Sequence, residues 1–168
     1  MTNWQIHVPH PLPEPLQRYP VVIAIPVQWG NMDALGHVNN VAPIRWFESG
    51  RVALLERLGV AELMTGEKLG PILAAVRCSY RRQLHYPDTV LIANRVSQLG
   101  RTSVTVEHAI YSMRTHHVTS EGESVVVVFD YQAQRPVRVP DDFRDAVLKI
   151  QTIDPPRVVG SSSGPEKE

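Results

Sequence analysis

The fold of this chain is decided by "WGNMDALGHVNNVAPIRWFE", residues 29–48, where a polar loop runs directly into an apolar pattern. Five polar side chains fall within ten positions of that loop: Asn31, Asp33, His37, Asn39 and Asn40. A cluster of this kind has two interpretations. It is either a set of caps for the helix that follows, or an active site built on the amino end of that helix.

The apolar spacing after the loop predicts an amphipathic helix over residues 40–58. Its apolar residues recur at intervals of three, four and seven: Val41, Ile44, Phe47, Leu54, Leu55 and Leu58. Pro43 is tolerated only in the first turn of a helix, so the helix must begin just before it, with Asn39 or Asn40 as its cap. Gly59 is a natural stop for the helix.

Segments typical of β-strands lie on both sides of this helix. One precedes it at 19–29, where Pro26 indicates an edge strand or a bulge. Four strand-like segments and a short helix follow it: 71–84, 88–99, 101–112, 122–132 and then 139–150. Turn residues separate the four strands at 86–88, 99–102 and 121–123, which predicts an antiparallel meander.

Alternating apolar residues provide the predicted sheet with one face to bury. Two such sets lie on neighbouring segments: Val90, Ile92 and Val96, then Val104, Val106, His108 and Ile110. A single amphipathic helix can cover that face. The pattern therefore predicts an α+β domain in which an antiparallel sheet is wrapped around one long central helix.

The 168 residues fit one folded domain with a segment of different composition at each end. Residues 1–17 are rich in proline and are expected to form an extended arm. Residues 18–152 form the predicted domain. Residues 153–168 are rich in Pro, Ser and Gly and are expected to be disordered. The amino terminus lacks the basic and apolar regions of a signal peptide, so we expect none.

Composition argues against nucleic-acid-binding and membrane-spanning proteins. The 17 basic and 17 acidic residues cancel, so the chain lacks the basic surface that a nucleic-acid backbone requires. Its apolar runs are far shorter than the ~20 residues of a membrane span. The single cysteine, Cys78, excludes an internal disulfide, and we interpret it as a buried apolar side chain in a cytoplasmic protein.

The sequence predicts neither a metal site nor a cofactor. His116 and His117 are adjacent, so they point to opposite faces of an extended chain, and no Cys or carboxylate stands at ligand spacing from them. The sequence also contains no serine nucleophile elbow, P-loop or dinucleotide fingerprint.

The order of elements resembles the hotdog fold, and the central motif narrows the resemblance. "WGNMDALGHVNNVAPIRWFESGR", residues 29–51, is similar to the motif of the 4-hydroxybenzoyl-CoA thioesterase-like family of acyl-CoA thioesterases. "LGRTSVTVEH" at 99–108 and "GESVVVVFDYQAQRPVRVP" at 122–140 resemble two further family segments. The resemblance implies hydrolysis of an acyl- or aroyl-CoA thioester to the free acid and coenzyme A.

The resemblance also implies roles for residues of the loop. The catalytic carboxylate of the family corresponds to Asp33, acting as nucleophile or general base. The first acidic position of the family's Asp-x-Asp pair is Asn31 here, and we expect altered loop bonding without loss of activity. The backbone N–H of Asn40 corresponds to the oxyanion donor, and Gly36 lets the loop turn tightly around the substrate. His37 either orients the carboxylate or the substrate, or is a packed loop residue.

Two further expectations concern coenzyme A and assembly. In the family, the segment matching Arg101, Thr102 and Ser103 helps to hold coenzyme A, although a strand turn with a solvated arginine has the same composition. One sheet around one helix leaves the helix exposed at an edge, so we expect a homodimer or homotetramer with its active site at a subunit interface. The competing hypothesis is a hotdog protein that binds an acyl group or a partner without turnover.

Overall fold

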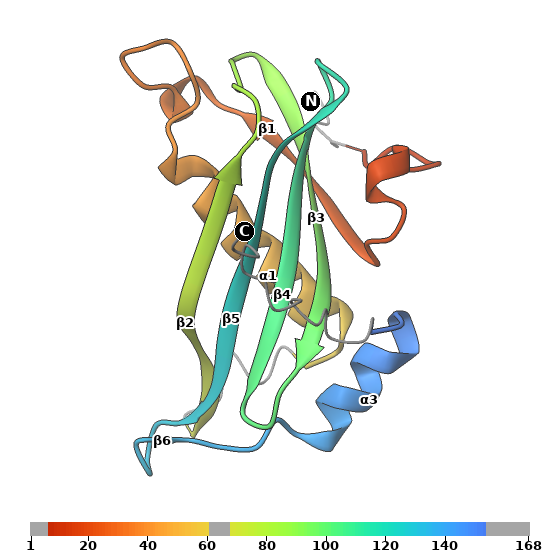
Figure 1. The fold of residues 1–168 in the computed structure, drawn as a ribbon, viewed down its shortest axis with the longest axis vertical. Coiled ribbons are helices and arrows are strands. Elements are labelled where there is room, and N and C mark those ends of the chain that lie inside the picture. Colours follow the sequence, from red (N-terminus) through yellow and green to blue (C-terminus); the bar gives the residue numbers. More distant parts are fainter. Residues whose placement is uncertain (1–6, 61–67, 154–168) are drawn as a thin grey trace, which may run out of the picture.

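The computed structural model describes residues 7–60 and 68–153. Its helices and strands run in the order β1 (Val21–Val27), α1 (Val41–Arg57), β2 (Leu69–Tyr80), β3 (Asp88–Leu99), β4 (Ser103–Ser112), β5 (His117–Asp130), β6 (Arg135–Pro136) and α3 (Asp141–Ile150). The strands form one antiparallel sheet in the order β1-β3-β4-β5-β2, with the short β6 beside β5. Helix α1 lies along one face of this curved sheet (Figure 1), as the sequence pattern predicts.

The predicted meander is correct for β3, β4 and β5 and wrong for β2. Strand β2 pairs with β5, at the opposite side of the sheet from β1. The reason is that a strand has only two edges, and those of β3 are taken by β1 and β4. The chain therefore crosses the sheet twice, once through α1 and once through residues 81–87.

The predicted turn at 121–123 is also wrong, because those residues lie inside β5. The turn between β4 and β5 falls earlier, and His116 there adopts a positive φ of 58°. Gly122 is not a turn residue; it allows the sheet and α1 to pack closely at this position. A Cβ built on it would lie 2.2 Å from the carbonyl oxygen of Arg77 and 2.5 Å from the ring of Phe47.

The core lies between α1 and the sheet. The alternating apolar residues predicted from the sequence form the side of the core that the sheet contributes. Trp46 and Phe47 of α1 pack on one cluster, with Val90, Ile92 and Ile110 from the sheet. Leu54 and Leu58 pack on a second cluster that α3 completes; its other members include Val96, Val104, Val106, Phe143 and Val147. Cys78 is half-buried at the edge of the first cluster, so it is more exposed than predicted, and burial raises the pKa of its thiol.

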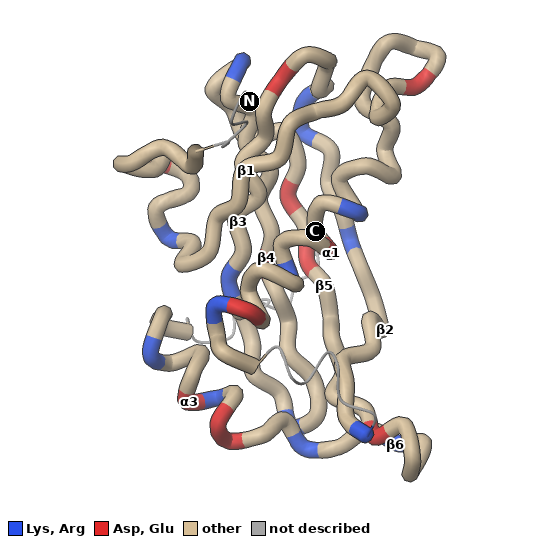
Figure 2. Tube along the Cα trace, turned by 180° about the vertical axis from the view of Figure 1, so that it is seen from behind, with Lys and Arg blue, Asp and Glu red and all other residues tan. Residues whose placement is uncertain are grey.

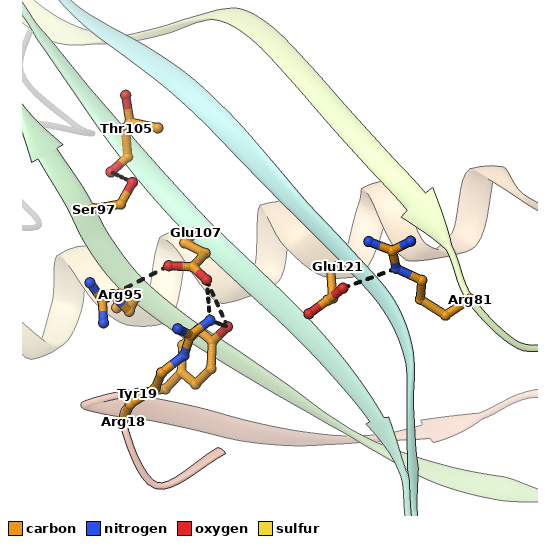
Figure 3. Close-up of polar contacts among 8 residues, drawn as sticks. All are labelled: Arg18, Tyr19, Arg81, Arg95, Ser97, Thr105, Glu107 and Glu121. Atoms are coloured by element: carbon orange, nitrogen blue, oxygen red, sulfur yellow. Dashed lines mark hydrogen bonds and ion pairs between the residues drawn. The ribbon is translucent and has the colours of Figure 1, made fainter. Parts of the chain in front are cut away.

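The outer face of the sheet is covered in part by the residues before β1. Glu14–Leu16 form one turn of 3-10 helix, and Leu16 and Tyr19 are buried against Leu91 and Tyr111. Beside this contact the outer face carries ion pairs. Arg18 and Arg95 pair with Glu107, and Arg81 pairs with Glu121 (Figure 3). Basic and acidic residues are interspersed over the chain (Figure 2), as the balanced composition implies.

Both ends of α1 follow the predicted chemistry. Asn40 already has helical dihedral angles, and the Asn39 side chain accepts a 2.9 Å hydrogen bond from the N–H of Val41, so Asn39 is the cap. At the other end Gly59 has a φ of 70°, and the N–H of Val60 donates to the carbonyl of Leu55.

A buried polar network joins α1 to the sheet. The imidazole of His108 is fully buried and stacks on Phe47, with ring centroids 4.4 Å apart. Its Nδ1 lies 2.8 Å from Asn94 Oδ1, and its Nε2 lies 2.9 Å from Ser124 Oγ, which also accepts a hydrogen bond from Arg51. A neutral imidazole satisfies this network, because Nδ1–H donates to Asn94 while Nε2 accepts from the Ser124 hydroxyl. Burial, and then the positive charge of Arg51, lower the pKa of His108 to about 3.

This network predicts a loss of stability in mild acid. The pKa of His108 in the folded state lies below the ordinary value of 6.5, so the unfolded chain binds the proton more tightly. The contribution of neutral His108 is thus complete above pH ~6.5 and is lost progressively toward the folded-state pKa. We expect the free energy of unfolding to fall by about 2 kcal/mol between roughly pH 7.5 and pH 5.

Urea unfolding at several pH values measures this change. The matched variant is His108→Gln, which keeps polar atoms at the position and cannot titrate in this range. Its absolute stability will be lower, but its pH slope is the quantity of interest. Equal slopes in the two proteins would show that His108 is not the titrating group.

Candidate active site

The loop between β1 and α1 is folded around the Asp33 side chain. Asp33 Oδ1 accepts hydrogen bonds from the backbone N–H groups of Leu35 at 2.8 Å and His37 at 3.3 Å. The backbone N–H of Asp33 donates to the His37 carbonyl at 2.8 Å, and Gly36 closes the turn with a positive φ of 78°. These contacts involve one carboxylate oxygen, Oδ1, so the loop fixes the Asp33 side chain, and no hydrogen bond to Oδ2 occurs among the described residues.

Asn31 shows how the departure from the family motif is accommodated. Its side-chain oxygen accepts a 2.8 Å hydrogen bond from the N–H of Gln28, and its carbonyl accepts one from the N–H of Asn39. An amide oxygen accepts such a bond as a carboxylate would. The geometry of the loop is therefore compatible with Asn at this position.

The first turn of α1 presents a backbone donor beside this loop. The N–H of Asn39 donates to Asn31, and the N–H of Val41 donates to the Asn39 side chain. Within the described residues, no hydrogen bond engages the N–H of Asn40. Pro43 has no N–H at all, so the start of the helix offers its free donor at Asn40.

Asp33, His37 and Asn40 line one cleft of about 380 Å³, which is large enough for part of a small-molecule substrate. Val38 and Pro43 form an apolar part of the same wall. The opposite wall comes from the end of β2 and the segment that follows it, with Tyr80, Arg81, Arg82, Gln83 and Leu84, and the neighbouring strand β5 adds Ser120. The three residues predicted to carry the chemistry are therefore brought together.

The two walls of the cleft are tied to each other. Tyr80 donates a 2.6 Å hydrogen bond from its hydroxyl to the Asn40 carbonyl, and the N–H of Val38 donates to the Leu84 carbonyl at 2.8 Å. The His37 ring lies beside that of His85, at a centroid distance of 4.9 Å, and His85 Nδ1 is 3.0 Å from the Gly36 carbonyl. The His37 ring thus contacts His85, the residue that directly follows the opposite wall.

The residues predicted to hold coenzyme A lie elsewhere in the chain. Arg101 and Thr102 belong to the turn between β3 and β4, and Ser103 is the first residue of β4. The start of β3 pairs with the end of β1 next to the Asp33 loop, and this turn follows the other end of β3, whose 12 residues span roughly 36 Å. Their predicted role therefore requires the cleft of a neighbouring chain.

Sequence reasoning offered Arg81 and Arg82 only as weaker candidates for binding coenzyme A, and it did not predict that residues 80–84 form a wall of the Asp33 cleft. The local pattern there indicates the end of a strand, and it makes Arg81 and Arg82 resemble ordinary surface charges. The signal that identifies them is topological: β2 must end beside the amino terminus of α1, and this follows only from the pairing of β2 with β5.

Over residues 7–60 and 68–153, no group of three His, Cys, Asp or Glu side chains is arranged to hold a metal ion. In the same residues, no helix has the length and apolar character needed to span a bilayer.

Comparison with known proteins defines the class. The thioesterase-like superfamily matches residues 27–147, which include the loop, α1, strands β2 to β6 and most of α3. The chain belongs to this superfamily, and its curled antiparallel sheet around one long helix is the hotdog fold expected from the sequence.

Individual relatives agree with this assignment. The PA2801 protein of Pseudomonas aeruginosa is 31% identical, with a TM-score of 0.68, over 75% of this chain and 96% of that protein. A thioesterase from Thermus thermophilus, crystallised with coenzyme A and zinc, is 25% identical with a TM-score of 0.71, over 80% of this chain and 96% of its own. The uncharacterized protein YsmA of Bacillus subtilis is 26% identical over 84 residues, which span 50% of this chain and 56% of that protein.

Proposed function

We propose that the chain is an acyl-CoA thioesterase that hydrolyses an acyl- or aroyl-CoA thioester at the Asp33 cleft. The observation that carries this proposal is the meeting of a carboxylate and a free backbone N–H in one cleft of a thioesterase-superfamily protein. A thioester needs both groups, because its carbonyl oxygen must be stabilised while its carbon is attacked. The related thioesterase that binds coenzyme A supports the choice of thiol.

The reaction divides the work between two elements. The N–H of Asn40, at the positive end of the α1 dipole, donates to the carbonyl oxygen as negative charge develops there. The Asp33 carboxylate either attacks the carbonyl carbon, giving an anhydride that water then hydrolyses, or removes a proton from an attacking water. In both routes the C–S bond breaks, water supplies the new acid oxygen, and the thiolate leaves to take up a proton. His37 would orient the carboxylate or the substrate.

A panel of acyl-CoA thioesters with detection of the free thiol tests this function. The panel should include short and long aliphatic acyl groups and hydroxylated aromatic ones, since the acyl group is unassigned. We expect turnover of at least one thioester, with release of acid and thiol in equal amounts. Binding of acyl-CoA without release of thiol across the panel would instead support the competing acyl-binding function.

We also propose that the protein is a homodimer or a homotetramer built from such dimers. Strand β2 is 12 residues long and lies at the edge of the sheet, where Leu73 and Val76 are 43% and 36% exposed. A long apolar edge of this kind is a template for pairing with another strand. Multi-angle light scattering should give at least twice the mass of one chain, and a monomer at working concentration would reject the proposal.

A further inference from the structure

The cleft contains a positive charge that the hydrolysis proposed above does not use. Arg81 and Arg82 both line the wall opposite Asp33. Arg81 is engaged elsewhere, because its Nε lies 3.0 Å from Glu121 Oε2 on the outer face of the sheet (Figure 3). Arg82 has no such engagement: throughout the described chain, no hydrogen bond or ion pair of its side chain occurs.

The backbone that carries Arg82 is held in place at two points. The N–H groups of Arg81 and Arg82 both donate to the carbonyl of Thr119, at 2.8 and 3.1 Å. Two residues further on, the buried Leu84 accepts the hydrogen bond from Val38 in the Asp33 loop. The segment is therefore a fixed rim, and the exposed Arg82 side chain extends from it at the lining of the cleft.

The other charged groups that line the cleft provide no ion-pair partner for Arg82 among the described residues. Asp33 is the one carboxylate among the described residues that line it, and one oxygen of Asp33 already accepts two loop N–H groups. With Arg81 neutralised by Glu121, the cleft retains one negative centre for chemistry and one positive centre opposite. A planar guanidinium binds carboxylate and phosphate oxygens through paired, charge-assisted hydrogen bonds.

We propose that Arg82 is a specificity-determining residue that binds an oxyanion of the substrate. This inference rests on the proposed function, since the anion belongs to the thioester that occupies the Asp33 cleft. The oxyanion is a carboxylate or a phosphate, and a substrate offers it from two sources. One is a carboxylate on the acyl group, and the other is a phosphate of coenzyme A.

Equilibrium binding to thioethers tests the inference without any turnover, so its outcome is separate from that of the thioesterase assay. Four probes combine the presence or absence of the two anions. S-butyl-CoA carries the phosphates alone, S-(3-carboxypropyl)-CoA carries phosphates and a carboxylate, S-(3-carboxypropyl)-pantetheine carries the carboxylate alone, and S-butyl-pantetheine carries neither. Titration calorimetry with wild type and Arg82→Gln gives the affinity of each probe. Arg82→Lys keeps the positive charge and removes the paired N–H donors of the guanidinium. Arg57→Gln is the control, because it removes an exposed positive charge at the far end of α1.

We expect Arg82→Gln to weaken binding of the probes that carry the recognised anion by about tenfold. S-butyl-pantetheine, which has no anion, should change less than about twofold, and Arg57→Gln should leave all four affinities as they are. A loss common to both CoA probes identifies a phosphate, and a loss common to both carboxypropyl probes identifies a carboxylate. Unchanged affinities for all four probes, or an equal loss that includes S-butyl-pantetheine, would overturn the inference. Unchanged thermal unfolding of Arg82→Gln shows that the variant is folded.

Discussion

Replacement of Asp33 by Asn is expected to lower turnover about 1000-fold while leaving the stability of the protein within about 1 kcal/mol of wild type. The two effects separate because Asp33 has two tasks. The amide oxygen of Asn can still accept the hydrogen bonds from Leu35 and His37, so the loop keeps its shape. It can neither attack the thioester carbon nor take a proton from water, so the chemical step fails.

The measurement is kcat on the best thioester of the panel, together with thermal unfolding of each variant. Asp33→Ala serves as a comparison, because it should lose activity and also destabilise the loop. Asp142→Asn, which removes an exposed carboxylate from α3, should change neither quantity. If the Asp33→Asn enzyme retained more than a tenth of wild-type kcat, Asp33 would have no chemical role.

Gly122→Ala should have the largest effect on stability, with a loss of roughly 3 kcal/mol or more. The added Cβ would meet the carbonyl oxygen of Arg77 at 2.2 Å and the ring of Phe47 at 2.5 Å. Neither neighbour can move cheaply, because the first is backbone in the β2–β5 pairing and the second is a fully buried ring stacked on His108. The close approach of α1 to the sheet therefore depends on this glycine.

Gly30→Ala is the matched control, since a Cβ at that position meets no atom within 4 Å. Chemical denaturation of both variants should show a large loss for Gly122→Ala and a change within about 0.5 kcal/mol for Gly30→Ala. Similar stabilities for the two variants would mean that the sheet and helix can separate at no cost. In that case the packing described here would not determine the fold.

Periodicity and turn chemistry were sufficient to predict most of the fold. The helix over 40–58, the edge strand containing Pro26 and the stop at Gly59 each follow from a local signal, and the structure confirms them. The position of β2 and the turn before β5 could not be read in this way. Strand order depends on which edges remain free, and Gly122 has the composition of a turn although its role is packing.

The residues of the candidate site also fall into those that a local pattern predicts and those that only strand pairing brings to the cleft. Asp33, His37 and Asn40 are close in the sequence, so their meeting in one cleft could be anticipated from a loop that precedes a helix. Tyr80 and Arg82 reach that cleft through the long-range pairing of β2, which leaves no local pattern. The turn with Arg101 differs from both. The resemblance in sequence predicts that it binds coenzyme A, but it does not say whether the cleft belongs to the same chain or to a neighbouring one.

The most direct test of the whole account is a crystal structure of the Asp33→Asn protein with its best acyl-CoA bound. We expect the thioester carbon to lie beside residue 33 and its carbonyl oxygen to lie about 3 Å from the backbone nitrogen of Asn40. A thioester bound outside this cleft, or a carbonyl oxygen directed away from the amino end of α1, would contradict it.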